Sequence, residues 1–248
     1  MVRPGRHQYL IRFAYDGQRF FGVSPQRDRP TVGASLYERL EAAAGQRPRA
    51  LQFTARTDTG VSAEENFATC WFLEPFDPVR FEAQFQKTLE DGITSVSATA
   101  VDIHVHARNI SSGKWYRYMI RSDGEEDPRA WGVEKPLDVQ AMKSLAARFE
   151  GEHDFSAFRW RCSAPDTMKT LARVEITAVP TGYIIDVEGD GFLRRMVRKI
   201  VGAIVWVGLG EATVEDVASL IDSGAKYGAP HGAPAHGLTL MAIRRTGS

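Results

Sequence analysis

A single carboxylate stands in a short polar segment between two apolar stretches of the sequence. Asp58 follows Thr57 and precedes Gly60 by two residues, and the apolar stretches 51–55 and 67–73 flank the segment. A carboxylate on a tight turn that emerges from a protein core is a candidate for catalysis. The structural alternative is a turn in which the aspartate accepts a hydrogen bond from its own backbone. The residue types alone leave both interpretations of Asp58 open.

The tripeptide Asp58-Thr59-Gly60 also matches the motif of the aspartic proteases. Protease chemistry needs two carboxylates that share one proton. A second Asp-Thr-Gly is absent from the sequence, and the one Asp-Ser-Gly, at 222–224, follows the helix expected after residue 213 rather than lying between two predicted strands. One copy would require a homodimer of a much smaller all-β chain, so the sequence argues against a protease.

Four cations fall within six residues at Arg194, Arg195, Arg198 and Lys199. Apolar spacing predicts a long helix over 192–209, on which Arg194 and Arg198 would share one face and Arg195 and Lys199 the next. Like charges at this spacing repel one another, so a phosphate backbone or a buried carboxylate would be needed to compensate them. The alternative is a solvated helix face, although apolar neighbours could draw Arg198 partly into the core.

Basic and aromatic residues alternate in the segment 103–122, which contains no acidic residue. Its basic residues are His104, His106, Arg108, Lys114, Arg117 and Arg121, and its larger aromatic residues are Trp115, Tyr116 and Tyr118. Such a strand suits single-stranded or splayed nucleic acid through phosphate contacts and base stacking. The alternative is an edge strand with one aromatic face in the core. The two histidines have no further cluster of ligands beside them, so we expect no metal site.

The elements that must position these residues follow from the hydrophobic pattern. Strands are predicted at 7–15, 51–55, 67–73, 94–105, 114–120, 171–179, 183–188 and 238–243. Helices are predicted at 31–44, 77–89, 138–149 and 192–209, with another after the capping box Thr213-x-x-Asp216. The first half has the order β-α-β-β-α-β of a ferredoxin-like unit, and the second half repeats it loosely. We therefore expect two domains, 1–107 and 108–248.

The composition is that of a soluble globular protein. The 248 residues are 43% hydrophobic and 25% charged, with 31 basic and 31 acidic residues. Zero net charge gives no bulk attraction for nucleic acid, but 24 of the cations are arginine, which binds phosphate in a bidentate fashion. Cys70 and Cys162 form no disulfide framework. With no signal peptide and no membrane span expected, the sequence predicts a cytoplasmic protein.

Taken in chain order, six motifs resemble those of the tRNA pseudouridine synthase A (TruA) family. They are Tyr15-Asp16-Gly17-x-x-Phe20-x-Gly22, Arg56-Thr57-Asp58-x-Gly60-Val61-x-Ala63, His106-Ala107-Arg108 with Lys114-x-Tyr116-Arg117-Tyr118-x-Ile120, Gly151-Glu152-His153-Asp154-Phe155-x-x-Phe158, Phe192-Leu193-x-x-Met196-Val197-Arg198-x-Ile200-Val201-Gly202 and Ala233-Pro234-Ala235-x-Gly237-Leu238. One short motif would be a weak signal, whereas six in order over most of the chain are specific.

The resemblance implies an α+β fold in which two ferredoxin-like halves form the pseudouridine synthase fold. That fold has a mixed, mainly antiparallel sheet and a central cleft. The resemblance further implies a homodimeric enzyme that isomerises uridine to pseudouridine in tRNA, at about positions 38–40 of the anticodon stem-loop, with no metal or organic cofactor.

The resemblance also implies a role for each matching residue. Asp58 would be the nucleophile, attacking either C1′ of the ribose or C6 of the uracil. Arg198 would pair with Asp58, Tyr116 would stack on the flipped uracil and help to transfer a proton, and Arg56 would fill the gap left by the flipped base. The implied substrate-binding residues are Arg56, Arg108, Lys114, Arg194, Arg195 and Leu240.

Several positions depart from the usual bacterial pattern of this family. Val23-Ser24 stands where Trp-Gln is common, Ala55 replaces Gly, Thr59 replaces Ala, and Ser62 replaces His. These departures keep open a second hypothesis, a non-catalytic RNA-binding paralogue of the same fold. The carboxylate of Asp58 favours the enzyme, because a pure RNA binder gains nothing from a negative charge beside phosphate.

Overall fold

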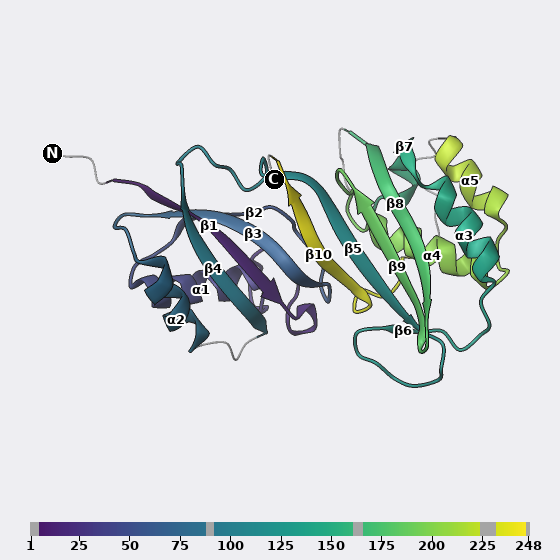
Figure 1. Ribbon diagram of the computed structural model, residues 1–248, viewed down its shortest axis with the longest axis horizontal. Helices are drawn as coiled ribbons and strands as arrows, with labels where there is room; N and C mark the ends of the chain where they lie inside the picture. The colour runs from purple at the N-terminus through teal and green to yellow at the C-terminus, as the bar shows by residue number, and fades with distance from the viewer. Residues whose placement is uncertain (1–4, 88–91, 161–165, 224–231, 247–248) are drawn as a thin grey trace. The chain divides into compact units, whose positions relative to one another are not determined.

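The chain folds into two compact units in the computed structural model, which describes residues 5–87, 92–160, 166–223 and 232–246 (Figure 1). The first unit joins residues 1–112 to 240–248, and the second comprises 113–239. The sequence pattern had placed the whole of 108–248 in one domain. The difference arises because the last strand, at 238–245, pairs with the strand at 62–72 of the first unit, a long-range contact that local patterns do not encode.

The first unit is an antiparallel sheet with two α-helices on one of its faces (Figure 1). Its elements in chain order are β1 (His7–Tyr15), η1 (Gly17–Arg19), α1 (Val32–Ala44), β2 (Arg49–Phe53), β3 (Ser62–Phe72), α2 (Pro78–Gln86) and β4 (Ile93–Val101). The strand order is β4-β1-β3-β10, where β10 spans Leu238–Arg245, and β2 pairs with β3. The chain order β-α-β-β-α-β is the ferredoxin-like order expected from the sequence.

Local signals in the sequence explain where the helices of the first unit begin and end. The Thr31 hydroxyl accepts a hydrogen bond from the Ala34 N–H and caps α1, and Gly45 ends that helix in the left-handed conformation. The Asp77 carboxylate caps α2, with Pro78 in the first turn. The core between helices and sheet contains Ile11, Phe13, Leu36, Leu40, Phe81 and Phe85, each at most 2% exposed.

The strands of the second unit pair mainly antiparallel, and three α-helices pack against them (Figure 1). Its elements are β5 (Ser111–Arg121), β6 (Trp131–Gly132), α3 (Val139–Arg148), β7 (Gly151–Asp154), η3 (Phe155–Phe158), β8 (Met168–Val179), β9 (Gly182–Gly189), α4 (Met196–Gly208) and α5 (Val214–Asp222). The strand order is β5-β9-β8-β7, and the short β6 pairs in parallel with β5. The α+β class and the mainly antiparallel pairing are therefore confirmed.

Helix α4 starts later in the chain than the apolar pattern predicts. It begins at Met196 rather than Phe192, because Arg195 adopts a left-handed conformation with φ of 61°. Other differences from the predicted bounds accompany it. Strand β3 starts at Ser62, strand β4 ends at Val101, and β6 and β7 were not predicted. Leu89 at the expected end of a helix, Cys162, and part of the segment 228–237, which is rich in Gly, Ala, Pro and His, lie outside the described residues.

No helix among the described residues is long and apolar enough to cross a membrane. Helix α4 is the most apolar helix of the second unit and spans 13 residues. Its buried face packs against α3 and η3, so its apolar character is accounted for by the core of the second unit.

Candidate active site

Asp58 lies on the tight turn that connects β2 to β3 in the first unit. The turn is closed by the Val61 N–H, which donates to the Asp58 carbonyl oxygen over 3.2 Å. Gly60 takes a positive φ of 81°, and its N–H donates to the Phe20 carbonyl oxygen over 3.4 Å. The Asp58 side chain is partly exposed, whereas its neighbours Thr57 and Val61 are buried. Hydrogen bonds and buried neighbours thus fix the backbone of the turn, while the Asp58 residue stays partly exposed to solvent.

A buried chain of hydrogen bonds fixes the turn from the side of the core. The Tyr15 hydroxyl lies 2.9 Å from the Thr57 hydroxyl, and the Thr57 hydroxyl lies 3.4 Å from the Val61 carbonyl oxygen. A carbonyl oxygen can only accept, so Thr57 donates to Val61 and Tyr15 donates to Thr57. The Asn66 amide nitrogen in turn donates to the Tyr15 oxygen over 3.5 Å. The chain of hydrogen bonds therefore runs in one direction, from β3 through β1 to the Asp58 turn.

Asn66 also holds the residue at which the loop leaves β2. Its amide nitrogen donates to the Ala55 carbonyl oxygen over 2.9 Å, and its amide oxygen accepts from the Ala55 N–H over 3.2 Å. Asn66 is fully buried, so these bonds satisfy backbone groups that no water reaches. The loop is consequently fixed both at its entry and at Thr57.

Glycines of the first sequence motif let the backbone approach the turn closely. A Cβ atom on Gly17 would lie 2.1 Å from the Val61 carbonyl oxygen, a distance that no side chain permits. Gly22 has a positive φ of 90°, and a Cβ there would lie 3.1 Å from the Thr57 carbonyl oxygen. The segment Tyr15–Gly22 and the Asp58 turn, which are far apart in the sequence, therefore form one packed structure.

In the second unit, Tyr116 lies on the buried face of β5. Tyr116 is 8% exposed. Its ring packs edge-to-face against the ring of Phe192, with the two centroids 5.2 Å apart. Lys114, two residues earlier, is half-buried. Burial lowers the pKa of the Lys114 ammonium group, and the negative charge of Asp190 acts in the opposite direction. An amine with a lowered pKa gives up its proton more readily than a solvated lysine.

Arg198 lies in the first turn of α4 and is held by the C-terminal motif. Its Nε donates to the Ala233 carbonyl oxygen over 2.7 Å, and the Ala233 N–H donates to the Arg198 carbonyl oxygen over 2.8 Å. The Tyr118 hydroxyl donates to the Pro234 carbonyl oxygen over 2.9 Å. Burial raises the pKa of Tyr118, and the positive charge of Arg198 opposes that rise. Three of the sequence motifs thus meet around Arg198 within the second unit.

The four-cation cluster is not arranged as the sequence predicted. Arg194 and Arg195 precede the helix, so the expected sharing of helix faces with Arg198 and Lys199 is wrong. Arg194 is exposed, and its carbonyl oxygen accepts from the Trp160 N–H. The Arg195 guanidinium lies over the Trp160 ring, 4.6 Å from the centroid. Lys199 is only 7% exposed, and burial lowers its pKa, so it does not form part of a solvated helix face.

The remaining site residues from the sequence differ in their exposure. Arg56, on the loop that carries Asp58, and Arg108 are exposed, as a contact with an external ligand requires. Leu240 is fully buried in β10. Asp58, Arg56 and Arg108 belong to the first unit, whereas Tyr116 and Arg198 belong to the second.

Comparisons with known proteins identify the family. A sequence model described as tRNA pseudouridine synthase matches residues 145–244. The tRNA pseudouridine synthase A of Thermosipho africanus is 35% identical over 95% of this chain and 98% of that protein. The enzymes of the same name from Syntrophotalea carbinolica and Neisseria meningitidis serogroup B are each 34% identical. They cover 92% and 96% of this chain, respectively, and 92% of their own lengths. The chain belongs to the tRNA pseudouridine synthase A family. The resemblance of the motifs is therefore confirmed.

Among solved structures, one from a Cbf5–Nop10–Gar1 complex aligns with 77% of this chain and 46% of its own chain. The sequences are 14% identical and the TM-score is 0.35. The family assignment rests on the sequence relatives.

The positions that depart from the usual pattern of the synthase family fit the structure of the Asp58 turn. The Ser62 hydroxyl accepts from the Gly17 N–H over 3.0 Å and so joins the first motif to the turn. Val23 is fully buried, and its N–H donates to the Thr57 carbonyl oxygen over 3.3 Å. Ala55 is held by Asn66, as described above. These substitutions therefore leave the support of Asp58 in place.

Sequence reasoning missed two residues with a clear part in this synthase site. Asn66 is the only side-chain amide in the segment 66–72, whose other residues are apolar or small. A single polar residue in an otherwise buried strand is the sequence feature that could have indicated its role. Trp160, which contacts Arg195, lies outside all six motifs and gave no signal. Among the described residues, no group of three or more His, Cys, Asp or Glu side chains is arranged to hold a metal ion.

The hydroxyl of Tyr15 provides a test of the buried chain. Burial raises the pKa of this hydroxyl to about 12, against an ordinary value of 10.0. Replacing Tyr15 by Phe leaves the Thr57 oxygen without its donor, and we expect a loss of about 1–2 kcal/mol in the free energy of unfolding at pH 7. The measurement is urea unfolding of both proteins, with Tyr183→Phe as control, because the Tyr183 hydroxyl makes no hydrogen bond to the described residues.

The pH dependence of this difference follows from the raised pKa. Below pH 10 both folded and unfolded chains keep the proton, so the Tyr15 contribution is complete. Between pH 10 and about 12 the unfolded chain loses the proton before the folded chain does, so the contribution falls. The difference in stability between the wild type and Tyr15→Phe should shrink over this range. A difference that stays constant up to pH 12 would contradict the buried donor role.

Proposed function

We propose that the chain isomerises uridine to pseudouridine in tRNA, with Asp58 as the nucleophile. The observation that supports this most directly is the Asp58 turn, whose backbone is fixed by the buried chain from Asn66 through Tyr15 to Thr57. A nucleophile held in this way needs little reorganisation when the substrate arrives. The family relationship indicates the class of reaction. The fixed turn holds a carboxylate that suits the nucleophilic step of that reaction.

The reaction requires a covalent step at a carbon atom of the nucleotide. The Asp58 carboxylate adds to C1′ of the ribose or to C6 of the uracil, and the N1–C1′ bond breaks. The detached uracil rotates, a bond forms between C5 and C1′, and the link to Asp58 is released. The hydrogen at C5 leaves as a proton, and N1, which lost its bond to C1′, takes up a proton. No oxidant or reductant takes part, because the product is an isomer of the substrate.

The proposal assigns the neighbouring residues to positioning the base and the nucleophile. Arg198 pairs with the Asp58 carboxylate and orients it through its planar guanidinium group. Tyr116 stacks on the flipped uracil and helps to move the proton. Arg56, exposed on the same loop as Asp58, fills the gap left in the RNA stack. Extruding a base costs a few kcal/mol, so a side chain that fills the gap is useful.

The same proposal covers the part of the RNA that is modified and the assembly of the protein. We place the target uridine in the anticodon stem-loop, at about positions 38–40, because the sequence motifs resemble those of enzymes with that target. The exposed side chains of Arg56, Arg108 and Arg194 are candidates for phosphate contacts, together with Lys114, Arg195 and Leu240 from the sequence motifs. We also place the protein in the cytoplasm.

The decisive experiment is the release of tritium from tRNA labelled at C5 of uracil. The wild-type chain should release tritium from unmodified tRNA, and Asp58→Asn should reduce release to background while tRNA binding persists. Mapping pseudouridine in the product should find it at about positions 38–40. Release that is independent of Asp58 would contradict its role. Binding without release by the wild type would favour the RNA-binding paralogue instead.

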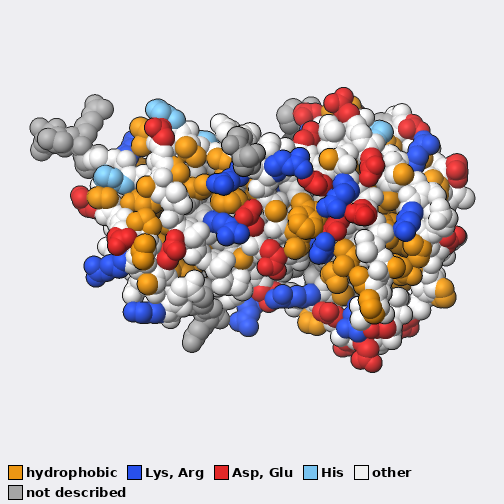
Figure 2. All heavy atoms as spheres, in the orientation of Figure 1, with side chains coloured by type: hydrophobic (Ala, Val, Ile, Leu, Met, Phe, Trp, Pro, Cys, Tyr) orange, Lys and Arg blue, Asp and Glu red, His pale blue; other side chains and the backbone are white. Residues whose placement is uncertain are grey.

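The neutral charge of the protein makes individual arginines testable. On the face drawn in Figure 2, basic side chains are interspersed with acidic ones rather than gathered in one patch. If the exposed Arg194 contacts a phosphate, Arg194→Gln should lower the slope of log K against log salt for tRNA binding by about one unit. Arg148→Gln is the matched control, because Arg148 is also exposed but lies 3.4 Å from the Asp222 carboxylate. Equal slopes for both variants would rule out the phosphate contact.

The proposed homodimer has a direct physical test. Light scattering on the purified chain should give about twice the mass of one chain, which is 27.6 kDa. A mass that stays at that of one chain at micromolar concentration, with tRNA isomerisation intact, would show that the monomer is the active form.

A further inference from the structure

A second group of arginines gathers around Trp71, near the far end of β3 in the first unit. Trp71 pairs with Gln8 on β1 and with Arg49 on β2, so these three side chains lie on the same face of the sheet. Buried Cys70 and Phe72 point to the opposite face, into the core under α1 and α2. The indole of Trp71 is partly exposed. An aromatic ring on this face lies outside the hydrophobic core, so core packing does not explain its presence.

Two guanidinium groups lie over the Trp71 indole. The Cζ atom of Arg6 is 4.9 Å from the ring centroid, and that of Arg49 is 5.5 Å from it. Both arginines are exposed, and neither forms a salt bridge with any carboxylate of the described residues. A cation–π contact orients a guanidinium group but leaves its N–H donors free. The ring therefore orders two positive charges whose hydrogen-bond donors face solvent.

The arginine–tryptophan cluster around Trp115 in the second unit has a different character. The Arg117 guanidinium also lies over an indole, that of Trp115, but it forms a bidentate pair with the buried Asp186 at 3.0 and 2.9 Å. The Trp115 indole N–H donates to the same carboxylate over 2.8 Å. Charge and donors are satisfied internally there, so the Arg117 cluster is structural. The cluster at Trp71 lacks the corresponding carboxylate in the part of the chain that the structure describes.

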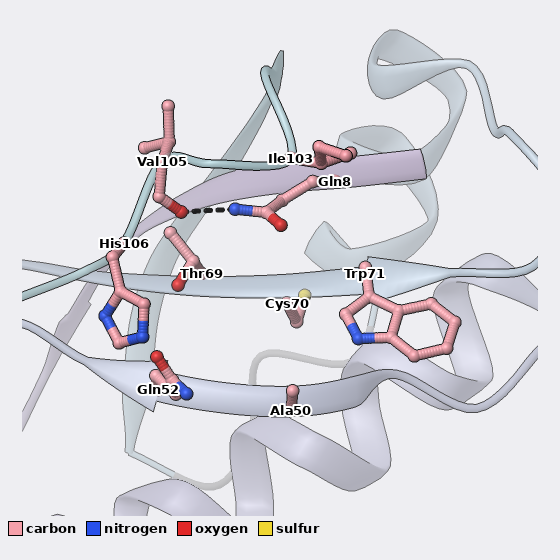
Figure 3. Close-up of a pocket in the computed structure, with 9 residues that line it drawn as sticks. All are labelled: Gln8, Ala50, Gln52, Thr69, Cys70, Trp71, Ile103, Val105 and His106. Carbon is pink, nitrogen blue, oxygen red and sulfur yellow. Dashed lines mark hydrogen bonds between the residues drawn. The ribbon is translucent and has the colours of Figure 1, made fainter. Parts of the chain in front are cut away.

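A shallow depression, lined by both polar and apolar residues, adjoins Trp71 on the same face. It has a volume of about 80 Å³, and the segment 103–106 forms one wall (Figure 3). The Gln8 amide points to the Val105 carbonyl oxygen, while Gln52 and His106 lie beside each other across the depression from Trp71. The Gln52 amide makes no hydrogen bond to any described residue. The depression is far smaller than the roughly 300 Å³ of pockets that enclose small ligands, so it suits only the edge of a larger molecule.

The cluster is too far from Asp58 to take part in the chemistry. Ser62, next to the Asp58 turn, and Trp71 are nine residues apart on one continuous strand. At about 3.4 Å per residue, the two ends are about 30 Å apart along β3. A ligand that touches both must be large, which a folded RNA is and a nucleotide is not.

We propose that Arg6 and Arg49, ordered by Trp71, bind the phosphate backbone of the tRNA at a second contact about 30 Å along β3 from the catalytic turn. The inference rests on the proposed function for its choice of RNA. Two exposed arginines without carboxylate partners complement a phosphate backbone in charge and in hydrogen-bond geometry. The free amide of Gln52 adds a group that can bind a ribose hydroxyl or a base edge in the depression.

The experiment measures binding of an unmodified tRNA transcript to the full chain over a range of salt concentrations. Arg49→Gln and Arg6→Gln should each weaken binding several-fold and lower the salt slope by about one unit. Arg47→Gln is the matched control: it lies two residues from Arg49 and is exposed, but it pairs with Glu41 at 3.1 Å. Trp71→Phe should keep most of the affinity, because phenylalanine retains a ring for the cation–π contact, whereas Trp71→Ala should not.

The outcomes separate this proposal from the proposed function. In the tritium assay, Arg49→Gln should raise KM and leave kcat unchanged, since the cluster does not touch the target base. Wild-type affinity and slope in both arginine variants would overturn the second contact, even if isomerisation is intact. A chain that shows no isomerisation, with binding still dependent on Arg6 and Arg49, would overturn the proposed function alone. Loss of affinity with an unchanged salt slope would also overturn the phosphate contact, and would point to a protein partner or to misfolding.

Discussion

The hydrogen bond between the Tyr15 and Thr57 hydroxyls is the contact on which the candidate site depends. Both groups are buried, so neither has water as an alternative partner, and breaking the bond would leave an unsatisfied oxygen in the core. The bond also has a fixed direction, because Thr57 must donate to the Val61 carbonyl oxygen. The partly exposed Asp58 therefore sits on a backbone that the core itself holds, and the core gains stability from the same bonds that orient the turn.

This dependence explains how changes in sequence around the turn are tolerated. Gly17 and Gly22 provide the close approach of two backbones, which no other residue can provide. Ser62, in contrast, needs only an oxygen that accepts from the Gly17 N–H, and Ala55 is held through its backbone by Asn66. The site thus constrains backbone geometry strictly and side-chain identity loosely. Departures at positions such as Ser62 are poor evidence against catalysis as long as Asp58, Tyr15 and Thr57 are present.

The sequence predicted what local physics determines. Strand β1 was predicted at its observed bounds from alternation, and α1 and the capping box of α5 from caps and stop signals. It failed where tertiary contacts prevail. The apolar periodicity continues across Arg195, but the left-handed backbone of that residue moves the start of α4 to Met196. No local pattern indicates that β10 returns to the first unit. The types of the site residues were readable, but the chain that fixes the turn was not, because it joins residues from β1, β3 and the loop.

When a protein without net charge binds RNA, the number of its arginines matters less than how many of them lack a carboxylate partner. Only those arginines offer an uncancelled positive charge to the phosphates. Arg117 and Arg148 have carboxylate partners in the fold, and their charge is largely neutralised before any ligand arrives. Within the described residues, the partner of Arg49 is an aromatic ring, which orders the guanidinium without cancelling its charge. Selective pairing of this kind places positive potential at a few sites and keeps the remaining surface neutral. Such a surface gains specificity for one shape of polyanion, because weak attraction elsewhere does not compete with the correct docking.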